Sequence, residues 1–240
     1  MVETALRAVI NRPDQAPALS LRERDRRHSF VRNALRERGA DALIVAGTDL
    51  LYLTAGVSGE EFGFLPTDEK EAMEVVIAWR WLSDIPKETL LGSQEWITKA
   101  RSGRDASPLI GCIEEQNLQV GTIGIAGPFT YRDQVKLMNA LPKANFVDVS
   151  DILNDARTIK SDEEIALIDR ANHIFDAAVQ RIHETARPGM LGGEVVQIGY
   201  QAMWDAGGDM GSAIGFNFGT DPAQNPVLGE ICHNLKIQEG

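Results

Sequence analysis

Cysteine is scarce in this sequence, which holds only two, Cys112 and Cys232, in 240 residues. Two distant cysteines do not form the framework of a disulfide-rich secreted domain and are typical of a reducing cytoplasm. The sequence also lacks an apolar run near the roughly 18 residues of a membrane-spanning helix, and its start lacks the apolar core of a secretory signal. We therefore expect a cytoplasmic protein with no membrane partner.

Positive charge is also in deficit, because 24 Lys and Arg face 35 Asp and Glu, which gives a formal net charge of −11. This balance argues against nucleic acid as a partner. One basic segment stands out at residues 21–38, which holds seven Arg, two Glu and one Asp. Its mixed charges favour a solvated amphipathic helix or a subunit contact over a nucleic-acid or membrane contact.

Helical and strand patterns alternate over the first 150 residues. Ser20 is a suitable N-cap for a helix that runs to about Arg38 and ends at Gly39. Short apolar runs predict strands at 42–47, 74–79, 122–127 and 145–150, with a helix at 131–141. Residues 57–71 predict a loop, and residues 95–117 predict mixed helix and loop. The alternation predicts an α/β domain over residues 20–152, preceded by a loose leader at 1–19.

The pattern changes near residues 152–160 and predicts a second domain over residues 153–240. Ser161 and Glu164 have the spacing of a capping box at the start of a long helix. Apolar residues then recur on one helical face, at Ile165, Ile168, Phe175, Val179 and Ile182. Arg187-Pro188-Gly189 ends this helix, and a second helix is predicted from about Gly193 to Ala206. Residues 212–219 predict a strand.

Three stretches together carry a resemblance to a known family. They are RTIKSDEEIALIDRANHIFDAAV at 157–179, RPGM at 187–190 followed by Glu194, and LLYLTAG at 50–56 with Ala55 inserted. They resemble the creatinase, prolidase and aminopeptidase P family, whose members show Arg-x-x-Lys-Ser-x-x-Glu at the start of the C-terminal pita-bread domain. The resemblance covers about residues 20–240. It implies an N-terminal creatinase-type α/β domain followed by the first part of a pita-bread α+β domain.

The same resemblance supplies the candidate catalytic residues. The segment FGTDPAQNPV at 218–227 is similar to a creatinase stretch in which a His stands at the position of Gln224. That family His contacts the substrate, and in creatinase it transfers a proton. Gln224 does not titrate near neutral pH, although it can form hydrogen bonds. His233 is the second candidate if its loop folds back, and it is otherwise an ordinary surface or interface residue.

Metal chemistry is implied only by the family. Its metallopeptidases bind two divalent cations through two Asp, one His and two Glu, and these cations activate a water. None of these five ligand positions occurs before Gly240, so we expect no cofactor in this chain and two divalent metal ions only in a longer form. We therefore interpret the chain as truncated and inactive as it stands. The apolar face of residues 165–182 agrees, because it needs a sheet or a partner to cover it.

The resemblance implies a hydrolase of the Xaa-Pro aminopeptidase, Xaa-Pro dipeptidase or creatinase type. Its substrate would be a small peptide or a small C–N-bonded molecule, and the protein would be a homodimer. Gln224 and the missing ligands favour a first alternative, a non-catalytic binding or dimerisation relative. The TDPAQNPV match favours a second alternative, a metal-free creatinase-like amidinohydrolase.

Two other groups of residues have more ordinary interpretations. His173 and Asp176 lie three residues apart on a predicted helix, but no third ligand accompanies them, so a solvated or capping role is favoured. Trp79 and Trp81 share one face of a predicted strand, which is typical of core or dimer packing. A substrate-side role for the two Trp stays open.

Overall fold

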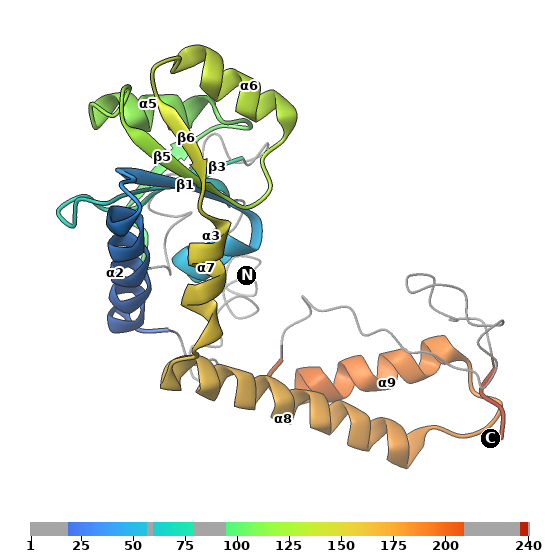
Figure 1. Ribbon diagram of the computed structural model, residues 1–240. Helices are drawn as coiled ribbons and strands as arrows, with labels where there is room; N and C mark the ends of the chain where they lie inside the picture. Colours follow the sequence, from blue (N-terminus) through green and yellow to red (C-terminus); the bar gives the residue numbers. More distant parts are fainter. Residues whose placement is uncertain (1–18, 57–59, 79–94, 209–235, 240) are drawn as a thin grey trace, which may run out of the picture. The chain divides into compact units, whose positions relative to one another are not determined.

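The computed structural model describes residues 19–56, 60–78, 95–208 and 236–239 (Figure 1). The chain divides into two compact units. One spans Leu19–Ser161, and the other contains the helices from Asp162 onward. In the described part of the chain, no helix combines the length and the apolar character that crossing a membrane requires.

A mixed six-stranded sheet forms the centre of the first unit, in the order β4-β3-β2-β1-β5-β6. The strands are β1 (Ala42–Ala46), β2 (Glu60–Pro66), β3 (Glu74–Ile77), β4 (Lys99–Ser102), β5 (Thr122–Ala126) and β6 (Asn145–Asp148). Strand β1 pairs in parallel with β5 and antiparallel with β2, and all five of its residues are buried. The apolar run at 42–47 therefore forms the central strand, as predicted.

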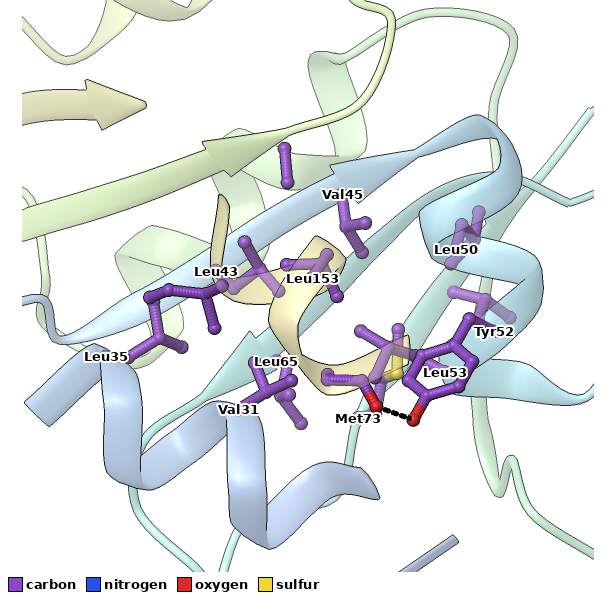
Figure 2. Packing of buried hydrophobic residues seen from close by; sticks show 14 of the residues in the cluster. Val31, Leu35, Leu43, Val45, Leu50, Tyr52, Leu53, Leu65, Met73 and Leu153 are labelled. Carbon is purple, nitrogen blue, oxygen red and sulfur yellow. Dashed lines mark hydrogen bonds between the residues drawn. The ribbon is translucent and has the colours of Figure 1, made fainter. Parts of the chain in front are cut away.

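Helices cover both faces of this sheet. Helices α2 (Leu21–Glu37), α3 (Gly47–Thr54) and α7 (Ser150–Thr158) lie on one face, and α5 (Ser107–Glu115) and α6 (Tyr131–Ala140) lie on the other (Figure 1). Each face has its own apolar core. Figure 2 shows the first, where Val31 of α2 and Leu153 of α7 pack near Leu43 of β1. The second contains Ile44 of β1 and Leu109 of α5. The predicted α/β class is confirmed.

Helix α2 begins and ends where the sequence predicted. The Ser20 hydroxyl accepts a hydrogen bond from the backbone N–H of Glu23 at 3.2 Å, which caps the first turn. The helix ends at Glu37, and Gly39 follows with a φ of 69°, a conformation that glycine adopts without the clash of a Cβ.

Strand β2 corrects the prediction of a loop over residues 57–71. Phe62 and Phe64 alternate with Gly63 along this strand and pack in the second core. A Cβ on Gly63 would lie 2.5 Å from Met73 Cε and 2.6 Å from Leu50 Cδ1, so the opposite core fills the space of a side chain. The glycine that suggested a loop marks a close approach inside a strand.

Strand β4 and helix α7 were not predicted either. Strand β4 has no apolar run, because it is an edge strand that pairs only with β3, in parallel. The strand predicted at 145–150 ends at Asp148, and α7 begins two residues later. Helix α7 belongs to the first unit, because Ile152 and Leu153 are buried in its first core.

The second unit contains α8 (Asp162–Thr185) and α9 (Gly192–Asp205), which pack against each other. Helix α8 starts directly after Ser161 and ends before Arg187, and α9 ends before Gly207, so both long helices are confirmed. Ala178 is the buried residue of α8. The strand predicted at 212–219 lies outside the described residues.

Candidate functional site

The two predicted catalytic residues, Gln224 and His233, lie outside the described residues, as do Trp79 and Trp81. Their roles stay predictions.

Helix α8 carries the pair His173 and Asp176. His173 is exposed, and its Nδ1–H donates to the backbone carbonyl of Asp169 at 2.8 Å, one turn earlier in the helix. No group of three or more His, Cys, Asp and Glu side chains in the described ranges is placed to hold a metal ion. Those ranges thus do not supply the donor set that a divalent cation needs, and no catalytic step through a metal rests on them.

The thiol of Cys112 in α5 is not an activated nucleophile. Burial raises the pKa of Cys112 to about 12, and the nearby negative charge of Glu74 adds to the rise. The Sγ atom lies 3.7 Å from Oε2 of Glu74, whose carboxylate also binds Arg101 at 2.6 Å. Because the thiolate is the reactive form of cysteine, Cys112 has a packing role.

Helix α2 buries four ionisable side chains, although its charges were expected to be solvated. They are Glu23, Arg27, His28 and Arg32. Arg27 donates through Nη1 to the carbonyl oxygen of Tyr52 at 2.6 Å. Its guanidinium also lies 4.2 Å from the ring centroid of Tyr52 and 5.2 Å from that of Trp96. These contacts join α2 to α3 and to the segment before β4.

Glu23 is the carboxylate of this buried group. Its Oε1 accepts from Arg27 Nε and from Arg26 Nη2, each at 2.7 Å. Burial by itself would raise the pKa of Glu23, but the hydrogen bonds from Arg26 and Arg27 outweigh burial and lower that pKa to about 2. Glu23 is therefore ionised in the folded protein and compensates the buried charge of Arg27.

His28 is neutral in the folded protein. Burial is the largest cause and lowers the pKa of His28 to about 4, and the charges of Arg32 and Arg24 lower it further. Its Nε2 lies 2.8 Å from the carbonyl oxygen of Leu53. A carbonyl can only accept, so Nε2 carries the proton and Nδ1 is the unprotonated nitrogen.

Tyr52 and Arg157, one from each of two stretches that carry the family resemblance, form contacts between α3 and α7. The hydroxyl of Tyr52 donates to the carbonyl oxygen of Ala156 at 2.8 Å, the dashed bond in Figure 2. Arg157 Nη1 lies 3.0 Å from Oδ1 of Asp49, an ion pair in which that oxygen receives no well-directed hydrogen bond from the described residues. The inserted Ala55 ends α3 in the left-handed conformation, with a φ of 56°.

A polar cleft of about 210 Å³ lies between α2, the connection from β2 to β3, and the segment that leads into β4. Helix α2 contributes Arg24, His28 and Arg32, the connection contributes Lys70, and Trp96 forms part of the wall before β4. It is the candidate functional site of the first unit, because it gathers buried ionisable groups around a space open to solvent.

This cleft was not predicted, although the sequence of α2 holds a signal for it. Arg24, His28 and Arg32 are spaced four residues apart, so they lie on one face of the helix. The contributions of Lys70 and Trp96 depend on the sheet, which brings distant segments to α2, and local patterns do not show this.

Comparison with known proteins places the chain in a family. A family model described as the creatinase/prolidase N-terminal domain matches residues 27–159, more than half of the chain. A protein of Sinorhizobium fredii (strain NBRC 101917 / NGR234), named an uncharacterized hydrolase/peptidase, is 36% identical over 84 residues, which make up 34% of this chain and 21% of that protein.

Solved structures with the same fold are peptidases by name. The Xaa-Pro dipeptidase from Bacillus anthracis matches with a TM-score of 0.61 at 19% identity, over 77% of this chain and 50% of its own. Dipeptidase PepE from Mycobacterium ulcerans matches with a TM-score of 0.65 at 18% identity, over 92% of this chain and 59% of its own. The X-Pro aminopeptidase from Thermotoga maritima MSB8 matches with a TM-score of 0.61 at 15% identity, over 75% of this chain and 49% of its own.

The chain thus spans about half the length of these solved structures. At such low identity the likeness concerns the fold, whereas the family model matches the sequence itself. The mixed sheet, the helices on both of its faces and the matched residues 27–159 lead to one conclusion: this chain belongs to the creatinase/prolidase N-terminal domain family.

Proposed function

We propose that this chain is the N-terminal part of a hydrolase of the Xaa-Pro dipeptidase and Xaa-Pro aminopeptidase type. In this proposal the unit Leu19–Ser161 is a non-catalytic domain, and α8 and α9 begin a pita-bread catalytic domain. The substrate is a small peptide, and the working form is a homodimer in a reducing cytoplasm. The observation that carries the proposal is the family match over 27–159, together with a fold shared with named peptidases across most of this chain.

The chemistry of the first unit supports a non-catalytic role for it. The buried Cys112 is held as a thiol, Glu23 is neutralised by two arginines, and Arg157 is paired with Asp49. Each of these groups is committed to a structural contact, so none is available as a nucleophile or general base. Hydrolysis would therefore be performed by residues outside this unit.

A second candidate function is a non-catalytic binding or dimerisation relative. Four large apolar side chains of α8 support it, because each is about half exposed to solvent: Ile165, Ile168, Phe175 and Val179. Such a row is typical of a surface that another surface covers. The row fits equally the start of a catalytic domain, so it favours assembly without deciding between the two functions.

The deciding experiment compares the chain 1–240 with the product of the complete source reading frame. Both are assayed for cleavage of the Xaa–Pro bond, which releases proline from an Xaa-Pro dipeptide and the first residue from a longer Xaa-Pro peptide, with Mn²⁺ and with a chelator. We expect no release by 1–240, and release by the complete product that the chelator abolishes. Thermal unfolding measured on both proteins confirms that inactivity does not come from a failure to fold.

Three outcomes contradict the proposal. Release of proline by 1–240 alone would place the active site within this chain. Turnover of creatine by the complete product, in the presence of chelator, would select the metal-free amidinohydrolase. A complete product that is folded and dimeric, yet hydrolyses neither substrate, would select the binding relative.

A further inference from the structure

The wall of the cleft beside α2 holds as many acidic as basic side chains, but the acidic ones already have partners. Each acidic side chain in its wall is paired with a cation. The pairs are Asp25 with Arg24 at 2.6 Å, Glu69 with Arg36 at 3.0 Å, and Glu71 with Lys99 at 3.0 Å. Two cations of the wall, Arg32 and Lys70, have no carboxylate oxygen within 4.0 Å among the described residues. The cleft therefore presents two positive charges without a close counterion.

Arg32 is the more informative of the two because it is buried, with 8% of its surface exposed. It donates through Nε to the carbonyl oxygen of Pro66 at 2.9 Å and through Nη2 to that of Glu71 at 2.6 Å. Its Nη1 has no acceptor in the described part of the chain. Arginine is rarely buried without a paired charge, since an uncompensated buried cation is costly.

The surroundings of Arg32 do not remove this cost. Burial is the largest influence on the pKa of Arg32 and lowers it, whereas Glu69 and Asp68 attract the guanidinium only from longer range. His28 beside it is neutral, so it adds no charge of either sign at neutral pH. A guanidinium with a free Nη1 edge, set in a small cleft, is suited to an oxyanion.

We propose that this cleft binds the carboxylate or phosphate group of a small molecule, with Arg32 as the buried anchor and Lys70 as a second cation at the exposed rim. The space of about 210 Å³ suits a small acid. Trp96 also lines this space, so its indole lies next to a bound ligand. The site lies wholly in the first unit and does not depend on the proposed hydrolase activity.

The test uses the Trp96 indole as a reporter. Its Nε1–H donates to the carbonyl oxygen of Leu19 at 3.0 Å, and its signal in a ¹⁵N-labelled chain is assigned with the variant Trp96→Phe. Phosphate and acetate are titrated separately, at constant ionic strength maintained with chloride. We expect a saturable shift of this signal with at least one of the two anions, which then identifies the bound group as phosphate or carboxylate.

Two matched lysine variants and one arginine variant distinguish specific anion binding from non-specific electrostatic attraction. Lys70→Ala should weaken binding by about two- to fivefold, as expected for one exposed charge. Lys143→Ala removes an exposed lysine that is not part of the cleft and should leave binding unchanged. Arg32→Met should weaken binding by roughly tenfold or more, because a buried charged hydrogen bond is lost.

If Arg32 serves only to hold the carbonyls of Pro66 and Glu71, neither anion will give a saturable shift. Equal effects of Lys70→Ala and Lys143→Ala would also overturn the proposal, because the attraction would then be unspecific. Should Arg32→Met fail to fold, which circular dichroism would report, the comparison of the two lysine variants still decides.

Discussion

Helices α2 and α8 distribute polar and apolar side chains in opposite ways. Helix α2 buries charged and titratable residues, namely Glu23, Arg27, His28 and Arg32. Helix α8 exposes about half of each of its large apolar residues, namely Ile165, Ile168, Phe175 and Val179. The usual rule places the first kind of residue outside and the second kind inside, so both helices depart from it, in opposite directions.

The difference shows that the available hydrogen-bonding and packing partners, more than the residue type, decide whether a side chain is buried. The buried cations and His28 of α2 meet backbone carbonyls or a carboxylate of their own unit, and Glu23 meets two guanidinium groups. Helix α8 packs against α9 and buries Ala178, whereas the four large apolar residues of its row stay about half exposed. The polar side chains of α2 thus have partners within the first unit, whereas the apolar row of α8 is suited to a further surface.

The largest effect that tests this comparison is expected from Arg27→Met. The substitution leaves the buried carboxylate of Glu23 with less compensation and frees the Tyr52 carbonyl, so we expect a loss of about 3–5 kcal/mol in the free energy of unfolding. Urea unfolding followed by circular dichroism at pH 7 measures it. The control Arg22→Met, at an exposed position of the same helix, should change stability by at most about 0.5 kcal/mol. Equal effects of both variants would show that the buried network does not stabilise α2.

The next effect concerns pH. The pKa of His28 is about 4 in the folded protein and 6.5 in the unfolded reference, so the unfolded state binds a proton first as the pH falls. Stability should therefore decrease from pH 6.5 toward pH 4, by roughly 3 kcal/mol in full. Glu23 acts in a lower window, since its pKa of about 2 lies below the reference of 4.5, and its contribution is lost between pH 4.5 and pH 2.

The two windows are separated by urea unfolding at pH 7, 5.5 and 4.5 with the variant His28→Gln. Gln can still donate to the Leu53 carbonyl but does not titrate, so the decrease between pH 6.5 and pH 4.5 should largely disappear. His173→Gln, at an exposed position of α8, should keep the wild-type profile. An unchanged profile in His28→Gln would mean that another group causes the acid sensitivity.

A smaller and opposite effect is expected from Ala55→Gly. Ala55 ends α3 with a φ of 56°, a left-handed conformation that costs an L-residue with a Cβ more than it costs glycine. The variant should raise the free energy of unfolding by about 0.5–1 kcal/mol. A gain in the midpoint of thermal unfolding measures it, and Ala34→Gly inside α2 should give a loss instead. A loss in Ala55→Gly would show that the Cβ makes contacts that outweigh the strain.

Sequence patterns predicted the elements whose burial or ends are set by their own residues. Strands β1 and β5 are apolar runs because both faces of the sheet are covered, and the ends of α2 follow from Ser20 and Gly39. Strand β2 was missed because Gly63 suggested a loop, although it makes room for Met73. Strand β4 was missed because an edge strand needs no apolar run.

The candidate site was less predictable for a physical reason. Arg27 and Arg32 donate to backbone carbonyls 25 to 39 residues away, and carbonyls leave no mark in the side-chain pattern. The charges of α2 were therefore expected in solvent, where such residues usually lie. Gln224 and His233 stay predictions that rest on the family resemblance alone.

The smallest expected effect is also the one that sharpens the comparison most. The double variant Phe175→Gln/Val179→Gln replaces two apolar residues of α8 that are 54% and 49% exposed. If this row is free in the 240-residue chain, the free energy of unfolding should change by no more than about 1 kcal/mol in total, while binding of an apolar dye should decrease. The buried control Leu153→Ala in α7 should lose about 2–5 kcal/mol. A loss of that size in the α8 variant would mean that the row is covered in solution, and analytical ultracentrifugation of both proteins would then report whether a second copy covers it.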